Sequence, residues 1–259
     1  MTVPTITDDF ASGLSPYWRV TEIGSGRVEP RGSGLWLTAY PTPQTHYTDA
    51  QISDYTDSDF KWRPPLRLTV RAYTTPEHEA LRGTAGFGFW NQPFMPGQVR
   101  LRLPQAVWFF FSSPPSNLQL AKGVPGPGWK AATMNARRWQ FMALAPTTPV
   151  SVLLMRVPAL YRRLWPVGQR AIGVSEHLLD GGLLAAPHTY SLDWLPDRVQ
   201  FSVDGTIIHE TPSAPGGALG FVAWIDNQYA IVTPQGQFGS GLLPVEQAQS
   251  LVLESVEIE

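Results

Sequence analysis

No cysteine occurs in the 259 residues of the chain. This absence excludes a disulfide framework, thiolate chemistry and a zinc site with thiolate ligands. The five histidines are scattered, without the close spacing that places two metal ligands on one helix or hairpin. Phosphate-binding loops, dinucleotide fingerprints and the nucleophile elbow of serine hydrolases are also missing. We therefore expect neither a bound metal nor a cofactor.

Charged residues are scarce, at 15% of the chain against about 25% in an average globular protein. Proline and aromatic residues are plentiful, with 25 prolines and 12% aromatics. This composition excludes acidic disorder, a coiled coil and collagen, and it favours an all-β protein.

The N-terminus lacks a secretion signal. Residues 1–9 have neither the basic start nor the apolar stretch of about 7–15 residues that such a signal needs. We expect a cytoplasmic protein unless a leader was removed.

Acidic residues are absent from residues 80–175, although the chain holds 21 of them. The same segment contains eleven basic residues: Arg82, Arg100, Arg102, Lys122, Lys130, Arg137, Arg138, Arg156, Arg162, Arg163 and Arg170. This separation could steer an anionic ligand to the protein. Alternatively, the two blocks of opposite sign meet in the fold and neutralise each other.

Short apolar or alternating runs separated by turn residues predict β-strands along most of the chain. The expected strands cover residues 34–40, 66–73, 85–90, 98–103, 106–112, 190–194 and 199–204. Residues 66–73 alternate and should be half-buried, whereas residues 106–111 are apolar throughout and predict a central strand. No repeat or linker divides the chain, so residues 1–259 are expected to form a single domain.

The exception is a short amphipathic helix predicted for Pro158–Ile172. Proline suits its first position, and Leu160, Leu164 and Trp165 follow at helical spacing around two arginines. It is too short to cross a bilayer. We expect it to pack on the outer face of the sandwich, with a lid or a membrane-surface element as alternatives.

Residues 188–205 resemble the H-x-Y-x-x-x-W-x-P-x-x-(I/V)-x-(F/W)-x-V-D-G hairpin of family 16 glycoside hydrolases, the laminarinases, lichenases and their relatives. Supporting matches follow in the order of that family: residues 8–10, Trp18, residues 34–37, 47–53 and 83–90, and residues 251–258. The resemblance implies a concanavalin A-like jelly roll of two antiparallel sheets, with the 158–172 helix as an insertion.

The catalytic motif of that family is missing. It places carboxylates on one strand as E-x-D-x-x-E, where one attacks the sugar and another, about 5 Å away, protonates the leaving oxygen. In this chain the corresponding strand, residues 105–113, carries only apolar or neutral side chains. Since residues 80–175 contain no acid, no shift of register restores the motif, and retaining glycoside hydrolysis is predicted to be absent.

Aromatic residues replace the carboxylates, which suggests a concave cleft for a small, largely apolar ligand. The residues expected to bind it are Trp90, Asn91, Trp108, Phe110, Trp224, Gln228 and Arg162. Whether the protein converts the ligand is open, and isomerisation or cyclisation is conceivable. The main alternative is a non-catalytic, lectin-like carbohydrate-binding module.

Two residues are candidates for acid–base chemistry. Asp226 lies in a polar cluster, residues 224–229, inside an apolar run, and an aromatic hollow would raise its pKa. The alternative is a solvated, inert hairpin tip at Asp226 and Asn227. His188 opens a strand and is the weaker candidate, because such a histidine more often caps or packs than catalyses.

A small-molecule ligand is the expected partner, and nothing in the sequence implies nucleic acid. Membrane contact is not expected, and a membrane-surface role of the 158–172 helix is the third of the functions considered. The oligomeric state is left open.

Overall fold

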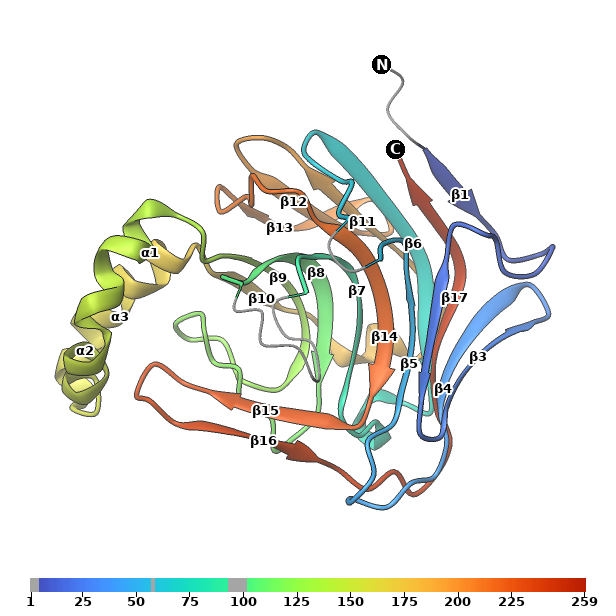
Figure 1. The fold of residues 1–259 in the computed structure, drawn as a ribbon, viewed down its shortest axis with the longest axis horizontal. Helices are drawn as coiled ribbons and strands as arrows, with labels where there is room; N and C mark the ends of the chain where they lie inside the picture. The colour runs from blue at the N-terminus through green and yellow to red at the C-terminus, as the bar shows by residue number, and fades with distance from the viewer. Residues whose placement is uncertain (1–4, 57–58, 93–101) are drawn as a thin grey trace.

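The computed structural model describes residues 5–56, 59–92 and 102–259, and the structural statements below concern these residues. Two antiparallel sheets, A and B, pack face to face, as expected for a jelly roll (Figure 1). A helical arm and a two-stranded ribbon stand on the side of sheet B that faces away from sheet A (Figure 1). None of the helices in the described ranges is long and apolar enough to cross a membrane.

Sheet A contains the hairpin on which the family resemblance was based. In spatial order its strands are β13 (Thr206–Thr211), β12 (Val199–Val203), β11 (His188–Trp194), β6 (Leu66–Thr75), β17 (Gln249–Ile258), β4 (Gly34–Ala39) and β3 (Gly26–Arg31), and β1 (Ile6–Asp8) pairs with β17. Along β6 the side chains alternate between buried and exposed or half-buried, so the predicted half-buried strand is confirmed. In the hairpin, Tyr190 pairs with Val203 and Trp194 pairs with Val199.

Sheet B contains the strand that replaces the catalytic one. In spatial order its strands are β10 (Ser175–Leu178), β9 (Gly128–Asn135), β8 (Gln105–Ser112), β7 (Thr84–Trp90), β14 (Gly220–Asp226), β5 (Asp49–Ser53) and β2 (Arg19–Ile23). The predicted central strand is confirmed, because β8 lies between β7 and β9 and is buried over nearly its whole length. Of the strand expected at residues 98–103, residues 98–101 lie outside the described ranges, and residues 102–103 are not in a strand.

Aromatic rings from both sheets fill the space between them. Phe109 of β8 lies 5.1 Å from Tyr190 of β11 and 5.3 Å from Phe201 of β12, measured between ring centroids. Phe87 and Trp129 extend this packing, and all five rings are almost completely buried. Burial of such large apolar surfaces is the main force that holds the two sheets together.

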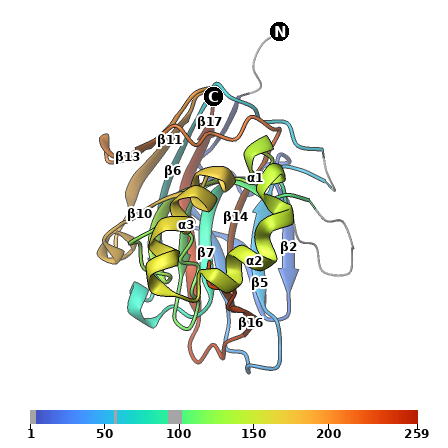
Figure 2. The same ribbon diagram turned by 90° about the vertical axis from the view of Figure 1, so that its left-hand side faces the viewer.

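The helical arm, residues 137–172, comprises α1 (Trp139–Leu144), the 3-10 turn η2 (Ala145–Thr147), α2 (Thr148–Leu154) and α3 (Pro158–Ile172) (Figure 2). The predicted helix is confirmed as α3. It continues through Pro166 and ends at Gly173, whose φ of 62° is the left-handed conformation common after a helix. However, α3 packs against α1 and α2 rather than on the outer face of the sandwich, because its apolar stripe meets apolar residues of those two helices.

The two-stranded ribbon consists of β15 (Gln228–Val232) and β16 (Phe238–Leu242) and lies beside the arm (Figure 1). Two further 3-10 turns, η1 (His78–Ala80) and η3 (Gly181–Leu184), pack against each other.

Candidate functional site

The outer face of β8 shows what stands where the family resemblance expects carboxylates. Alternate residues of this strand, Val107, Phe109 and Phe111, enter the core between the sheets. The side chains at the intervening positions face away from sheet A. They are Ala106, Trp108, Phe110 and Ser112. The strand itself therefore offers no acid or base on this face.

Four of the residues expected to bind a ligand form one aromatic cluster, Trp90, Trp108, Phe110 and Trp224. Trp90 and Trp224 are nearly parallel, with ring centroids 6.5 Å apart, and Trp108 stacks on Phe110 at 5.5 Å. Phe110 and Trp224 are each less than 10% exposed, whereas Trp90 and Trp108 keep part of their surface open. The rings thus cover one another and leave a partly exposed aromatic surface.

Asp226 ends β14 and is buried. Its Oδ1 accepts hydrogen bonds from the backbone N–H groups of Thr84 and Gln228 and from the Thr84 hydroxyl, at 2.8 to 3.1 Å. Burial raises the pKa of Asp226 to about 6, although these three donors act in the opposite direction. The Thr84 hydroxyl oxygen also accepts a bond from the Trp224 indole N–H, so Asp226 is linked to the aromatic cluster.

The alternative of a solvated hairpin tip at Asp226 and Asn227 is wrong. The Asn227 side chain is fully buried, accepts a bond from the backbone N–H of Thr48 and donates to the carbonyls of His46 and Leu243. These bonds turn the chain out of sheet B into the separate β15–β16 ribbon. Asn227 therefore has a structural role.

A second carboxyl group that the sequence reasoning missed lies beside Asp226. Asp49 of β5 is its register partner and is also buried. Burial first, and the neighbouring charge of Asp226 second, raise the pKa of Asp49 well above its ordinary value, while the Tyr47 hydroxyl opposes this shift. Two acidic residues separated by 177 positions in the sequence thus lie side by side in sheet B.

The raised pKa of Asp226 predicts that the protein loses stability as the pH rises. The folded state binds more protons than the unfolded state between pH values of about 4 and 6, so the stabilisation is complete below this range and lost above it. The loss attributable to Asp226 is about 3 kcal/mol. Urea unfolding across this pH range should show that the free energy of unfolding falls less steeply with pH in Asp226→Asn than in the wild type, because the asparagine stays neutral.

The matched control for this prediction is Asp204→Asn. The pKa of Asp204 is lowered by the backbone N–H of Thr189 and by His188, so its contribution is lost as the pH falls, the opposite sign. If the free energy of unfolding falls with pH equally in Asp226→Asn and in the wild type, the assignment of this titration to Asp226 is wrong.

The remaining predicted residues lie apart from the aromatic cluster. His188 is on sheet A, where its Nδ1 lies 2.6 Å from the Asp204 carboxylate. Arg162 is exposed on α3, and Gln228 lies on the ribbon. The structure therefore does not bring His188, Arg162 or Gln228 together with Trp108, and only Asn91 reaches one of the cavities described next.

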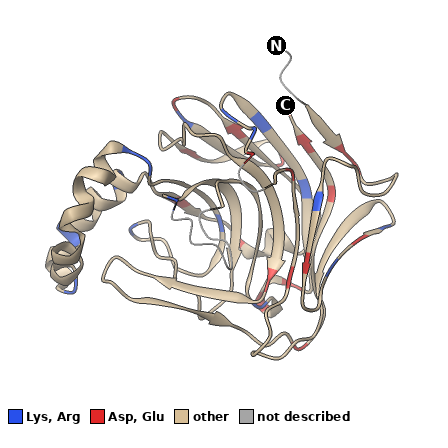
Figure 3. Ribbon diagram, viewed as in Figure 1, with Lys and Arg blue, Asp and Glu red and all other residues tan. Residues whose placement is uncertain are grey.

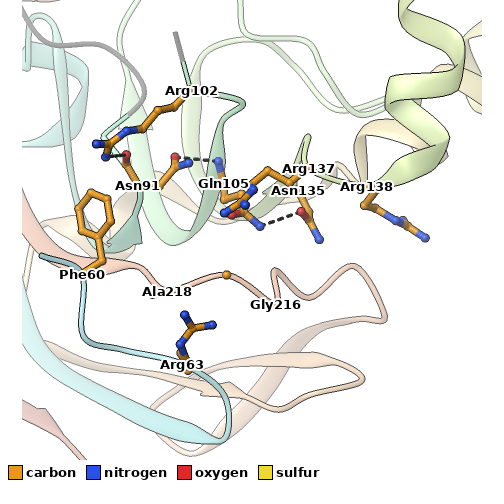
Figure 4. Close-up of a pocket in the computed structure, with 11 residues that line it drawn as sticks. Phe60, Arg63, Asn91, Arg102, Gln105, Asn135, Arg137, Arg138, Gly216 and Ala218 are labelled. Atoms are coloured by element: carbon orange, nitrogen blue, oxygen red, sulfur yellow. Dashed lines mark hydrogen bonds between the residues drawn. The ribbon is translucent and has the colours of Figure 1, made fainter. Parts of the chain in front are cut away.

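A cavity of about 760 Å³ opens where β7 ends and β8 begins, and we call it the arginine cavity (Figure 4). Its lining residues come from five separate segments: Phe60, Arg63, Asn91, Arg102, Gln105, Asn135, Arg137, Arg138, Gly216, Gly217 and Ala218. Among these described lining residues, four are arginines and none is acidic. Arg63 lies on the opposite side of the cavity from Arg102 and Arg137 (Figure 4).

Amide side chains form one wall of the arginine cavity. Asn91 Oδ1 accepts from the backbone N–H of Gln105 at 3.0 Å, and Gln105 Nε2 donates to Asn135 Oδ1 at 2.9 Å (Figure 4). Gln105 is 2% exposed, yet its Oε1 has no hydrogen-bond partner among the described residues. A Cβ on Gly217 would come within 2.5 Å of this oxygen, so only glycine leaves room for it. The wall is thus held in place by hydrogen bonds among its own amide groups, and Gln105 Oε1 is buried against Gly217.

Positive charge gathers in the described lining of the arginine cavity. Arg63 and Arg137 are exposed, and neither has a carboxylate partner in the described ranges. Arg138 donates to the backbone carbonyl of Arg170, and the Arg102 guanidinium lies 5.4 Å from the centre of the Phe60 ring. Three of these four arginines come from the acid-free segment. Its charge is therefore concentrated here and on the arm, rather than neutralised throughout (Figure 3).

The second cavity, about 330 Å³, lies between the helical arm and the β15–β16 ribbon. Its lining is mostly apolar and includes Phe141, Met155 and Trp165 from the arm and Val232 and Phe238 from the ribbon.

Comparisons with known proteins identify the fold. No protein-family model matches the sequence, and no curated protein matches it. Among solved structures, a prokaryotic β-1,3-1,4-glucanase (lichenase) from a mouse hindgut metagenome aligns with a TM-score of 0.55 at 12% identity, covering 98% of both chains. A laminarinase from Flavobacterium sp. UMI-01 aligns with a TM-score of 0.53 at 12% identity, again covering 98% of both chains. The carbohydrate recognition domain of Emp47p aligns with a TM-score of 0.52 at 10% identity, covering 98% of this chain and 93% of that chain.

These likenesses define the class of the molecule: a jelly-roll sandwich of the type found in laminarinases and lichenases. The predicted fold and the predicted resemblance are confirmed at this level. Identity of 10–12% carries no further functional conclusion by itself.

Proposed function

We propose that the protein binds an acidic carbohydrate in the arginine cavity. The observation that carries this proposal is a cavity of about 760 Å³ whose described lining residues include four arginines and three amide side chains but no acid. Guanidinium groups recognise carboxylate, sulfate and phosphate by paired, charge-assisted hydrogen bonds. The ligand therefore carries negative charge.

The polar wall favours a saccharide over the largely apolar ligand expected from the sequence. Amide side chains in the lining are hydrogen-bonding groups of the kind that bind hydroxyl groups, and the Phe60 ring offers an apolar surface to a sugar ring. A largely apolar ligand would offer no charged partner to the guanidinium groups of Arg63 and Arg137, whereas an anionic ligand would. The alternative of a lectin-like module therefore becomes the principal proposal.

The fold supports the same class of ligand. The similar solved structures include two glucanases and a carbohydrate recognition domain. A recognition domain shows that this architecture does not require hydrolysis to act on a glycan. The outer face of β8 supports a binding role in this chain, because Ala106, Trp108, Phe110 and Ser112 provide no nucleophile or acid for retaining hydrolysis.

Calorimetric titration with trigalacturonic acid and with its uncharged methyl ester tests the proposal. Both probes have the same rings and differ in charge. We expect saturable binding of the acid and affinity lower by on the order of 10- to 100-fold for the ester, since hydrogen bonds to charged groups contribute about 1.5–3 kcal/mol. The difference should shrink at high salt.

Citrate provides the control for sugar recognition, because it has carboxylates but no sugar ring. Equal binding of the acid and its ester would contradict the role of the arginines. Equal binding of citrate and trigalacturonic acid would contradict recognition of a carbohydrate.

A second candidate function rests on Asp226. Its pKa of about 6 suits proton transfer near neutral pH, and Thr84 links it to the aromatic cluster. The partly open surface of Trp90 and Trp108 would hold a small apolar ligand, whose isomerisation or cyclisation was considered from the sequence. The position of a bound ligand in the structure distinguishes the two candidate functions.

A cytoplasmic location of the protein stays a prediction.

A further inference from the structure

The helical arm exposes large apolar side chains on the side away from its own packing. Thirteen large hydrophobic residues are exposed in the described chain, and seven belong to the arm: Trp139, Met142, Val150, Leu153, Leu154, Val157 and Val167. Trp139 is 74% exposed and Leu153 is 61% exposed. Such a concentration of apolar surface marks an interaction site.

Apart from Val167, which lines the smaller cavity, these side chains are not among those that line it. Phe141, Leu144, Met155 and Trp165 point inward to the smaller cavity, and the Trp165 indole N–H donates to the carbonyl of Leu120 at 3.0 Å. The inner stripe thus has its partners within the protein. The outer apolar surface has none among the described residues.

Positive charge surrounds this outer surface. The arm contains six arginines, at positions 137, 138, 156, 162, 163 and 170, and no acidic residue. Arg156, Arg162 and Arg163 are exposed and have no carboxylate partner in the parts of the chain that the structure describes. Figure 3 shows basic residues on the helices and the acidic residues on the sandwich.

We propose that the arm docks on the surface of an anionic lipid bilayer. Exposed tryptophan and aliphatic side chains enter the boundary between headgroups and acyl chains, while arginines bind lipid phosphates. The helices lie on the membrane, since none of them is long and apolar enough to cross it. Charge favours this occupant over a second copy of the arm, because two arms would bring twelve arginines together without an acidic residue.

Vesicle sedimentation tests this proposal on the full chain. We expect binding to vesicles of equimolar phosphatidylglycerol and phosphatidylcholine at low salt, and little binding to phosphatidylcholine alone. The variant Arg156→Gln/Arg162→Gln/Arg163→Gln should lower the partition coefficient by on the order of 100-fold, because each basic residue near an anionic surface contributes about fivefold. The matched control, Arg19→Gln/Arg27→Gln/Arg198→Gln, changes the same charge on other faces and should bind as the wild type does, apart from a small loss.

The apolar part of the surface has its own readout. Brominated phosphatidylcholine in the same vesicles should quench tryptophan fluorescence, and Trp139→Phe should remove most of this quenching. Leu153→Ser should weaken binding to the vesicles. Ile207 is 60% exposed on β13, outside the arm, and Ile207→Ser should leave binding unchanged. Since these residues are exposed, the variants should fold normally.

Three results would overturn the proposal. They are no sedimentation with the anionic vesicles, equal loss of binding in the arm and control variants, and quenching that Trp139→Phe leaves unchanged. Concentration-dependent dimers in analytical ultracentrifugation that Leu153→Ser abolishes, without vesicle binding, would assign the surface to a second copy instead. None of these results depends on whether the arginine cavity binds a saccharide.

Discussion

Glu176→Ala is expected to lower the free energy of unfolding by about 3–5 kcal/mol, because the change leaves the Lys130 ammonium buried without its counter-charge. Lys130 of β9 is completely buried, and its Nζ lies 3.5 Å from Glu176 Oε1 on β10. Burial lowers the pKa of Lys130 and raises that of Glu176, and each charge partly offsets the shift of the other. Glu176 Oε2 also accepts the backbone N–H of Ala121, which would lose its partner. Urea unfolding at neutral pH measures the change.

The control for this prediction is the double variant Lys130→Met/Glu176→Leu. Replacing both charges with apolar groups of similar volume should recover most of the lost stability, since the desolvation cost disappears together with the attraction. A double-mutant cycle then gives the coupling between the two side chains. If Glu176→Ala lowers the free energy of unfolding by only about 0–1 kcal/mol, as loss of an exposed ion pair would, then the Lys130–Glu176 pair is solvated and the prediction is wrong.

Arg63→Glu/Arg137→Glu is expected to reduce affinity for trigalacturonic acid by at least about 100-fold. Each substitution removes a donor and adds repulsion toward the ligand carboxylates, and charges of like sign in contact cost several kcal/mol. Both side chains are exposed and have no carboxylate partner in the described ranges, so the fold should be retained. Isothermal titration calorimetry and an unfolding curve on the same sample separate loss of binding from loss of structure.

The matched control changes the net charge equally at a distance from the cavity. Arg19→Glu/Arg27→Glu alters two exposed arginines near β2 and β3 and should reduce affinity only slightly, by weaker long-range attraction that salt screens. Equal losses in both variants would mean that the arginine cavity is not the binding site.

Much of the fold could be predicted because its signals are local. A few neighbouring residues are enough to predict which side chains of a strand are buried. This holds for the alternation along β6, the apolar run of β8 and the hairpin of β11 and β12. The helix α3 was predicted in the same way. In contrast, α1 and α2 are short, with Pro146 between them and Pro149 in the first turn of α2, so no helical period of useful length precedes Val157.

The candidate site was less predictable because its residues meet only in three dimensions. Asp226 was singled out as a polar residue in an apolar run, but its partner Asp49 comes from a distant strand that nothing local marks as functional. Among the residues expected to bind a ligand, Asn91 lines the arginine cavity, while the aromatic residues form their own cluster. The absence of acids from residues 80–175 was the signal that pointed to the cavity, and it needed the fold to assign Arg102, Arg137 and Arg138 to one place.

The location of bound trigalacturonic acid in a crystal of the protein tests the central claim most directly. The account predicts a sugar ring inside the arginine cavity and a ligand carboxylate within hydrogen-bond distance of the Arg63 or Arg137 guanidinium. A ligand seated on Trp90 and Trp108, with the arginine cavity free of it, would contradict the account.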